Sequence, residues 1–115
     1  MNSDFYCAEV ISGKTLVTKI VETESVLAFQ HTRPAYPVHI VVIPKQHVES
    51  LVMLDLTDTS LLYEMLQMIQ NIATIVLAAH GACRVITNLG TYQESKHLHW
   101  HIVSGERITE PANLH

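Results

Sequence analysis

The chain has 115 residues, a formal net charge of -4 at neutral pH and an isoelectric point near 6.0. Its length indicates one domain, and 48% hydrophobic with 16% charged residues is the composition of an ordinary globular protein. The acidic balance disfavours a nucleic-acid partner, because no surplus of basic residues is present to neutralise a phosphate backbone.

The start of the chain, MNSDFYCAEV, lacks the charged and apolar regions of a secretory signal. The longest apolar run, at 72–79, is too short to span a bilayer. The two cysteines, Cys7 and Cys83, do not make a disulfide framework. We therefore expect a cytoplasmic protein with two free thiols and no membrane partner.

The first predicted elements are strands. Alternating apolar residues and a polar break predict a two-stranded hairpin over 15–30. A proline-containing loop follows at 32–37, and then a strand over 38–43 that is apolar on both faces and therefore central in its sheet. His39 lies inside this strand, and a buried histidine needs a partner.

A long helix is predicted over 57–80, because apolar residues recur there at steps of three and four. Thr57 or Asp58 can cap its start, and Gly81 is a natural stop. A short helical turn is predicted within 47–54, and two last strands within 83–89 and 97–103. This order of strands, helix and strands predicts an α+β domain with an antiparallel sheet.

His97, His99 and His101 alternate with apolar residues in the segment HLHWH. Alternate residues of a strand point to the same side, so the three imidazoles share one face. The intervening apolar residues share the other face and are expected to pack under the long helix: Leu98, Trp100 and Ile102.

Three interpretations of this histidine face compete. A solvent-exposed strand does not explain why every exposed residue is histidine. A zinc-centred hydrolase is a second interpretation, since His-x-His is a good half-site for zinc, but no carboxylate lies in the segment and three strand positions converge poorly on one ion. The third is covalent catalysis, in which a neutral imidazole attacks phosphorus while the neighbouring imidazoles balance the charge on the phosphate oxygens. His39, on the central strand, could close the same site.

Three segments resemble one known family. HLHWHIV matches the pattern His-x-His-x-His followed by two apolar residues, SVLAFQHTRPAYPVHIVVIPKQH resembles a strand–loop–strand segment ending in Pro-Lys-x-His, and RVITNLG resembles an Asn-bearing strand. Over about residues 8–105 the chain is similar to the histidine triad (HIT) family, in the branch of HINT-like purine nucleoside phosphoramidases. The resemblance implies a five-stranded antiparallel sheet with one long and one short helix, and a homodimer.

The resemblance also implies an activity. Such proteins are nucleotidyl hydrolases or transferases that act on nucleoside 5′-monophosphate compounds through a nucleotidyl-histidine intermediate. His99 would be the nucleophile, with His97 and His101 flanking it and His39 lining the site. The implied substrate contacts are Asn88 and Gln93 with the ribose and phosphate, and Phe29, Thr32 and Val41 with the nucleobase. A dinucleoside polyphosphate hydrolase is an alternative within the same family.

Two departures from the family pattern concern the substrate. His31 stands where the family has an acidic residue that holds the ribose hydroxyls, and the loop GTYQESK before the triad is about two residues short and lacks a second glycine. A histidine can still hydrogen-bond a hydroxyl. The substitution motivates a further alternative, a nucleotide-binding or regulatory protein with little turnover.

Some members of the family hold a structural zinc ion through Cys-x-x-Cys and two histidines. The corresponding residues here are Asp4, Cys7, His47 and His97, so one cysteine is retained. A structural zinc site of these four residues is an alternative, but we expect Cys7 to be a packed thiol rather than a zinc ligand, and we expect no cofactor.

Overall fold

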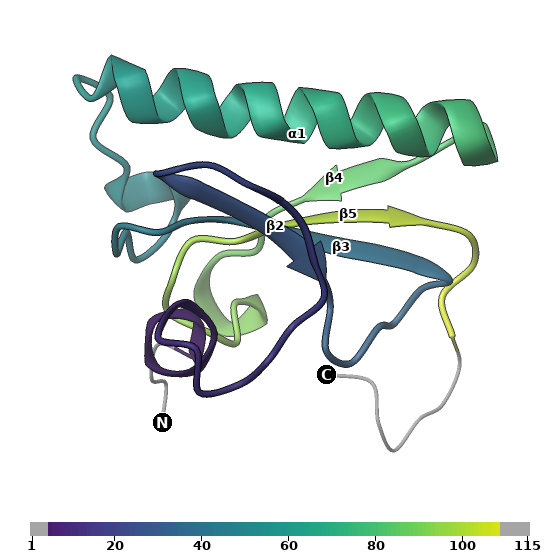
Figure 1. The fold of residues 1–115 in the computed structure, drawn as a ribbon, viewed down its shortest axis with the longest axis horizontal. Coiled ribbons are helices and arrows are strands. Elements are labelled where there is room, and N and C mark those ends of the chain that lie inside the picture. The colour runs from purple at the N-terminus through teal and green to yellow at the C-terminus, as the bar shows by residue number, and fades with distance from the viewer. Residues whose placement is uncertain (1–4, 109–115) are drawn as a thin grey trace.

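The protein, described here over residues 5–108 by a computed structural model, is a five-stranded antiparallel sheet crossed on one face by a long helix (Figure 1). The strands are β1 (Lys19–Glu22), β2 (Val26–Gln30), β3 (Val38–Pro44), β4 (Arg84–Ile86) and β5 (Trp100–Ser104), and the helix is α1 (Thr59–His80). Their order in the sheet is β1-β2-β3-β5-β4. This confirms the expected α+β fold, including a short 3-10 helix at Leu51–Met53.

Helix α1 begins and ends at the residues that the sequence favours. The side chain of Asp58 accepts a hydrogen bond from the Leu61 N–H at 3.1 Å, and Gly81 adopts a φ of +85° and donates its N–H to the Leu77 carbonyl. By length and composition α1 could cross a membrane. However, one face of it packs on the sheet, through Leu61, Met65, Met68, Ile69, Ile72 and Val76.

The strands separate two hydrophobic cores, because successive side chains point to opposite faces. In β3, Ile40 and Val42 pack toward α1, whereas Val41 and Ile43 belong to the second core. Between β5 and α1 lie the apolar residues that the sequence assigned there, Leu98, Trp100 and Ile102. The predicted double-faced central strand is therefore confirmed.

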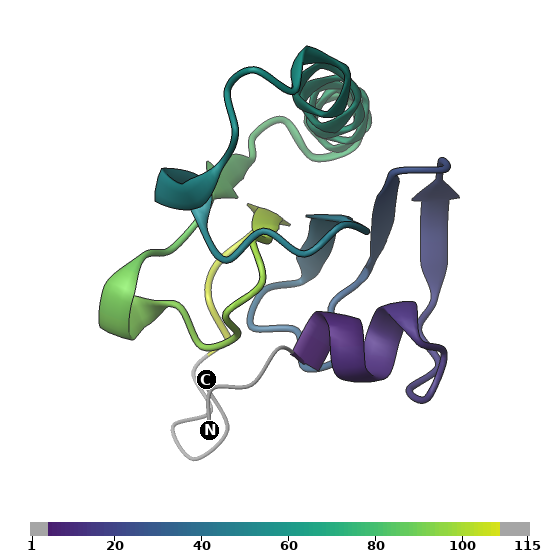
Figure 2. The same ribbon diagram turned by 90° about the vertical axis from the view of Figure 1, so that its left-hand side faces the viewer.

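A short N-terminal π-helix, Tyr6–Ile11, covers the face of the sheet opposite α1 (Figure 2). This helix is an addition to the elements that the sequence predicts. Tyr6 and Val10 are buried against the second core, and Tyr6 packs on Phe29 with their ring centroids 5.9 Å apart. The sheet is thus enclosed between two helices of very different length, and the histidines lie on the side of the shorter one.

Strand β5 is shorter than predicted, since regular pairing starts at Trp100 and leaves His97 and His99 in the extended segment before it. Two central strands nevertheless align the histidines: Val41 of β3 lies opposite His101, and His39 lies opposite Val103. His39 and His101 are therefore diagonal neighbours on adjacent strands, close enough for their side chains to meet.

Candidate active site

A cavity of about 820 Å³ opens on the sheet face that carries the histidines. This volume lies within the range of sites for small molecules. Its lining comes from the loop after β2, from β3, from the segment around the start of β5, and from the residues after β5. The lining includes His31, His39, Asn88, His99, His101 and Arg107.

His99 is held in one orientation by the backbone. Its Nδ1 lies 2.7 Å from the carbonyl oxygen of His97. An oxygen can only accept, so Nδ1 carries the hydrogen and the neutral ring has its lone pair on Nε2. The hydroxyl of Thr87 donates to the His99 carbonyl at 2.9 Å, which fixes the backbone at the same residue. His99 lines the cavity with a defined tautomer in which Nε2 carries the lone pair of the neutral ring.

His39 and His101 form a hydrogen-bonded chain. The Ala35 N–H donates to Nδ1 of His39 at 3.0 Å, so His39 carries its hydrogen on Nε2 and donates it to Nδ1 of His101 at 2.9 Å. In the neutral His101 ring the hydrogen is then on Nε2. The fixed bond from the Ala35 backbone therefore determines that His101 is a hydrogen-bond donor beside His99, whose ring centroid is 5.0 Å away.

Burial favours the neutral form of these rings. It lowers the pKa of His101 to about 3, with His99 as the next contributor, and the pKa of His39 to about 4, with His31 and then Arg107 contributing. Burial also lowers the pKa of His31, helped by His99. Near neutral pH His39 and His101 are therefore uncharged and in defined tautomers, which suits hydrogen-bond donors.

His31 stacks on His39, with ring centroids 4.2 Å apart and an interplanar angle of 29°. Its Nδ1 accepts the Arg33 N–H at 2.9 Å, so the neutral ring presents an N–H at Nε2. His31 lines the cavity, as do Thr32 and Asn88. The position expected to hold ribose hydroxyls therefore offers a donor, where a carboxylate would offer only acceptors.

The structure turns other predicted substrate contacts away from the cavity. Gln93 is buried, and its side-chain amide donates to the Glu49 carbonyl at 2.7 Å. Phe29 and Val41 are 1% and 0% exposed in the second core, because Tyr6 and Val10 cover them. Gln93, Phe29 and Val41 are therefore not among the described residues that line the cavity, and their contact with a substrate stays a prediction.

Tyr6 is a cavity residue that the sequence analysis missed. Its ring centroid lies 4.9 Å from that of His99 and 6.1 Å from that of His97. The Ser95 hydroxyl accepts the Phe5 N–H at 3.2 Å, which ties the start of this helix to the loop before β5. The four-residue spacing of Tyr6 and Val10 was the available signal, since it puts both on one side of a helical turn.

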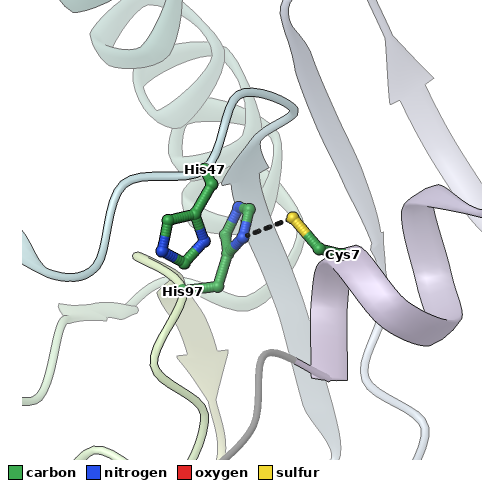
Figure 3. A group of neighbouring side chains, drawn as sticks. All are labelled: Cys7, His47 and His97. Carbon is green, nitrogen blue, oxygen red and sulfur yellow. Dashed lines mark hydrogen bonds between the residues drawn. The ribbon is translucent and has the colours of Figure 1, made fainter.

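His97 faces away from the cavity, toward Cys7 and His47 (Figure 3). It is fully buried, and its Nε2–H donates to the Pro44 carbonyl at 2.7 Å. The lone pair of the neutral ring is therefore on Nδ1, 3.3 Å from the Cys7 sulfur. Within the triad, His97 orients His99 through its backbone carbonyl while its side chain belongs to a separate cluster.

The chemistry of this cluster fits zinc. One ligand atom from each of Cys7, His47 and His97 lies within 4.8 Å of the others. Sulfur and imidazole nitrogen are the usual donors to structural zinc, and a histidine ligand commonly donates its other N–H to a carbonyl, as His97 does to Pro44. A zinc ion here would clip the N-terminal helix to the strand ends. Asp4, the fourth residue of the sequence-based set, lies outside the described residues.

The comparisons with known proteins agree with this geometry. The model of the HIT domain matches residues 13–108. The chain belongs to the histidine triad family. This histidine triad protein is 35% identical over 97 residues to an uncharacterized HIT-like protein of Chlamydia muridarum, covering 84% of this chain and 77% of the relative.

Solved structures support the same family. A HIT family hydrolase from Legionella pneumophila superposes with a TM-score of 0.78 at 27% identity, covering 95% of this chain and 98% of the other. A histidine triad protein from Clostridium difficile gives a TM-score of 0.76 at 32% identity, covering 93% and 94%. This histidine triad protein therefore has the fold of the family's hydrolases, and the similarity supports a hydrolase.

Proposed function

We propose that this histidine triad protein is a nucleotidyl hydrolase that cleaves nucleoside 5′-monophosphate compounds, such as phosphoramidates or adenylates, at the bond from phosphorus to the leaving group. The observation that carries the proposal is the 2.7 Å bond from Nδ1 of His99 to the His97 carbonyl, which puts the lone pair of a cavity-lining ring on Nε2. Nucleophilic attack needs a nitrogen that is oriented and carries a lone pair.

The proposed reaction has two steps. Nε2 of His99 attacks phosphorus and a P–N bond forms, while the bond to the leaving group breaks and the leaving group departs with the electron pair and a proton from solvent. The ring becomes positively charged, and the His97 carbonyl stabilises that charge through Nδ1–H. The Nε2–H of His101 donates to the phosphoryl oxygens. Water then attacks phosphorus and loses a proton to solvent as the P–N bond breaks, which releases the monophosphate and restores neutral His99.

The decisive experiment is trapping of the intermediate. A single turnover with an adenosine 5′-phosphoramidate labelled at phosphorus, quenched and mapped, should give an acid-labile label on His99. His99→Ala should lower kcat at least about a thousandfold, whereas His80→Ala, which removes an exposed histidine at the end of α1, should not. Turnover retained in folded His99→Ala would contradict the assignment.

We also propose that the protein is a homodimer. Strand β4 is a three-residue edge of the sheet, and Val85 in it is 43% exposed. The outer side of α1 carries further exposed apolar residues, including Tyr63, Leu66 and Leu77. An open strand edge beside apolar surface favours association. Sedimentation equilibrium should give twice the chain mass, and Val85→Lys should lower that value.

A further inference from the structure

Two arginines line the same cavity as His99. Arg33 and Arg107 are exposed, and neither makes an ion pair with another residue between 5 and 108. Each is fixed to the histidine row through the backbone. The Arg33 N–H donates to His31, and the Ile108 N–H, next to Arg107, donates to the Ala35 carbonyl at 2.8 Å. Arg33 also contributes to the lowered pKa of His31, and Arg107 to that of His39, so each positive charge acts on one of the two stacked rings.

The histidines form a row that leads from the nucleophile to these arginines. The ring centroids of His99 and His101 are 5.0 Å apart, those of His101 and His39 are also 5.0 Å apart, and His31 stacks on His39 at 4.2 Å. A phosphoryl group over His99 would therefore lie at one end of the row. The neighbouring part of the same substrate would lie over His39 and His31, beside the arginines.

This end of the cavity presents hydrogen-bond donors. His31 carries its hydrogen on Nε2, because Nδ1 accepts from the Arg33 backbone, and His101 carries its hydrogen on Nε2 by the chain of bonds from Ala35. Among the described residues that line the cavity, Glu94 is the only carboxylate, and it lies on the loop before β5. Neutral N–H groups and two guanidinium groups together favour a dianion.

A metal ion is a poorer fit at the same place. Ring nitrogens of His31, His39 and His101 lie within 4.8 Å of one another. However, His39 uses both nitrogens in hydrogen bonds, and Nδ1 of His101 accepts one of them. A cation could bind His39 only if one of those bonds broke, whereas an anion can use the N–H groups as they stand.

We propose that this end of the cavity binds a second phosphate of the substrate, carried on the 2′ or 3′ oxygen of its ribose. The proposal rests on the proposed function, which places a ribose beside the reacting 5′-phosphoryl group. A carboxylate suits free ribose hydroxyls and repels a ribose phosphate, while arginine accommodates the phosphate, as dinucleotide-binding sites show. This cavity has the arrangement that accommodates a ribose phosphate, because it places His31 where a carboxylate would stand and adds two arginines, Arg33 and Arg107.

The test compares three substrates: adenosine 5′-phosphoramidate and its 2′-phosphate and 3′-phosphate derivatives. The loss or gain of a charge-assisted hydrogen bond to the substrate changes its affinity by about tenfold. We expect kcat/KM to be about tenfold higher for one phosphorylated isomer, which identifies the oxygen concerned, and the ratio to fall as salt is raised. Arg33→Ala with Arg107→Ala should lower the ratio, and His31→Asp should invert it. Lys14→Ala, a remote loss of one exposed charge, should leave the ratio unchanged.

Equal or lower kcat/KM for both phosphorylated isomers overturns this proposal while the hydrolase assignment stands. If no substrate is cleaved, calorimetry with adenosine 3′,5′-bisphosphate, adenosine 2′,5′-bisphosphate and AMP decides separately. Tighter binding of a bisphosphate, lost in the double arginine variant, supports the ribose-phosphate site even though the hydrolase proposal fails. Binding of AMP as tight as that of both bisphosphates overturns it.

Discussion

Acidification should weaken this protein through His39 and His101. Both rings have a folded-state pKa below the unfolded value of about 6.5, namely about 4 and about 3, because burial disfavours their charged form. At a pH between the folded-state and the unfolded-state pKa, the unfolded chain binds more protons than the folded one. The free energy of unfolding therefore falls as pH drops below 6.5, and this contribution is fully present only above that pH.

The size of the effect follows from the two pKa values. Each of these rings stays neutral in the folded state and titrates normally in the unfolded state. When the pH falls from 6.5 to 5, each ring therefore lowers the free energy of unfolding by about 1.6 kcal/mol. Two such rings give about 3 kcal/mol. Because both border an open cavity, solvent screens part of the effect, and we expect about 2 kcal/mol for the pair.

Urea denaturation at pH 7, 6 and 5, followed by circular dichroism, measures this loss. The double variant His39→Gln with His101→Gln should have a flatter dependence on pH, whatever its absolute stability. His80→Gln, at an exposed position, should keep the wild-type dependence. A wild-type stability that is constant or rises from pH 6.5 to pH 5 would refute the reasoning, as would an equal slope in the double variant.

Three further predictions concern single changes. Zinc at a hundredfold excess over its Kd should raise the free energy of unfolding by about 2.7 kcal/mol. The readout is a higher Tm, which a chelator should reverse and Cys7→Ser should abolish. An unchanged Tm would count against a zinc site at Cys7, His47 and His97. Leu98→Ala, at a fully buried position, should lower the free energy of unfolding, measured by urea denaturation, by about 2–5 kcal/mol. A smaller loss would mean that neighbouring side chains fill the space left by the leucine. Gly105→Ala should cost more than about 1 kcal/mol, because φ is +89° there and the new Cβ would lie 2.8 Å from Cγ of Pro37; a neutral change would show that the loop yields.

Most of the fold was readable from local patterns. Asp58 and Gly81 delimit α1 by capping chemistry that works within one turn, and the double-faced apolar run of β3 could only be a covered strand. The start of β5 was less readable. Alternation in HLHWH indicates which side chains share a face, but pairing with β3 begins only at Trp100.

The histidine lining of the cavity was predictable, and its surroundings were not. Spacing and family resemblance brought together His39, His99 and His101, which do line one cavity. They could not show that Tyr6 would cover Phe29, since that contact joins segments far apart in the chain. Nor could they show that Gln93 would satisfy the Glu49 carbonyl, because a buried amide takes whichever acceptor the fold brings near.

The alternation over residues 98–102, across the start of β5, has a consequence for mutational scanning. Leu98 and Ile102 belong to the core under α1, whereas His99 and His101 border the cavity on the other side. A residue-by-residue library through this segment should therefore show losses of two kinds in strict turn. Losses at the even positions should recover when cells are grown cooler or given a stabilising second mutation, and those at the odd positions should not. Within five neighbouring positions, the library would then distinguish substitutions that lower the amount of folded protein from substitutions that lower its activity.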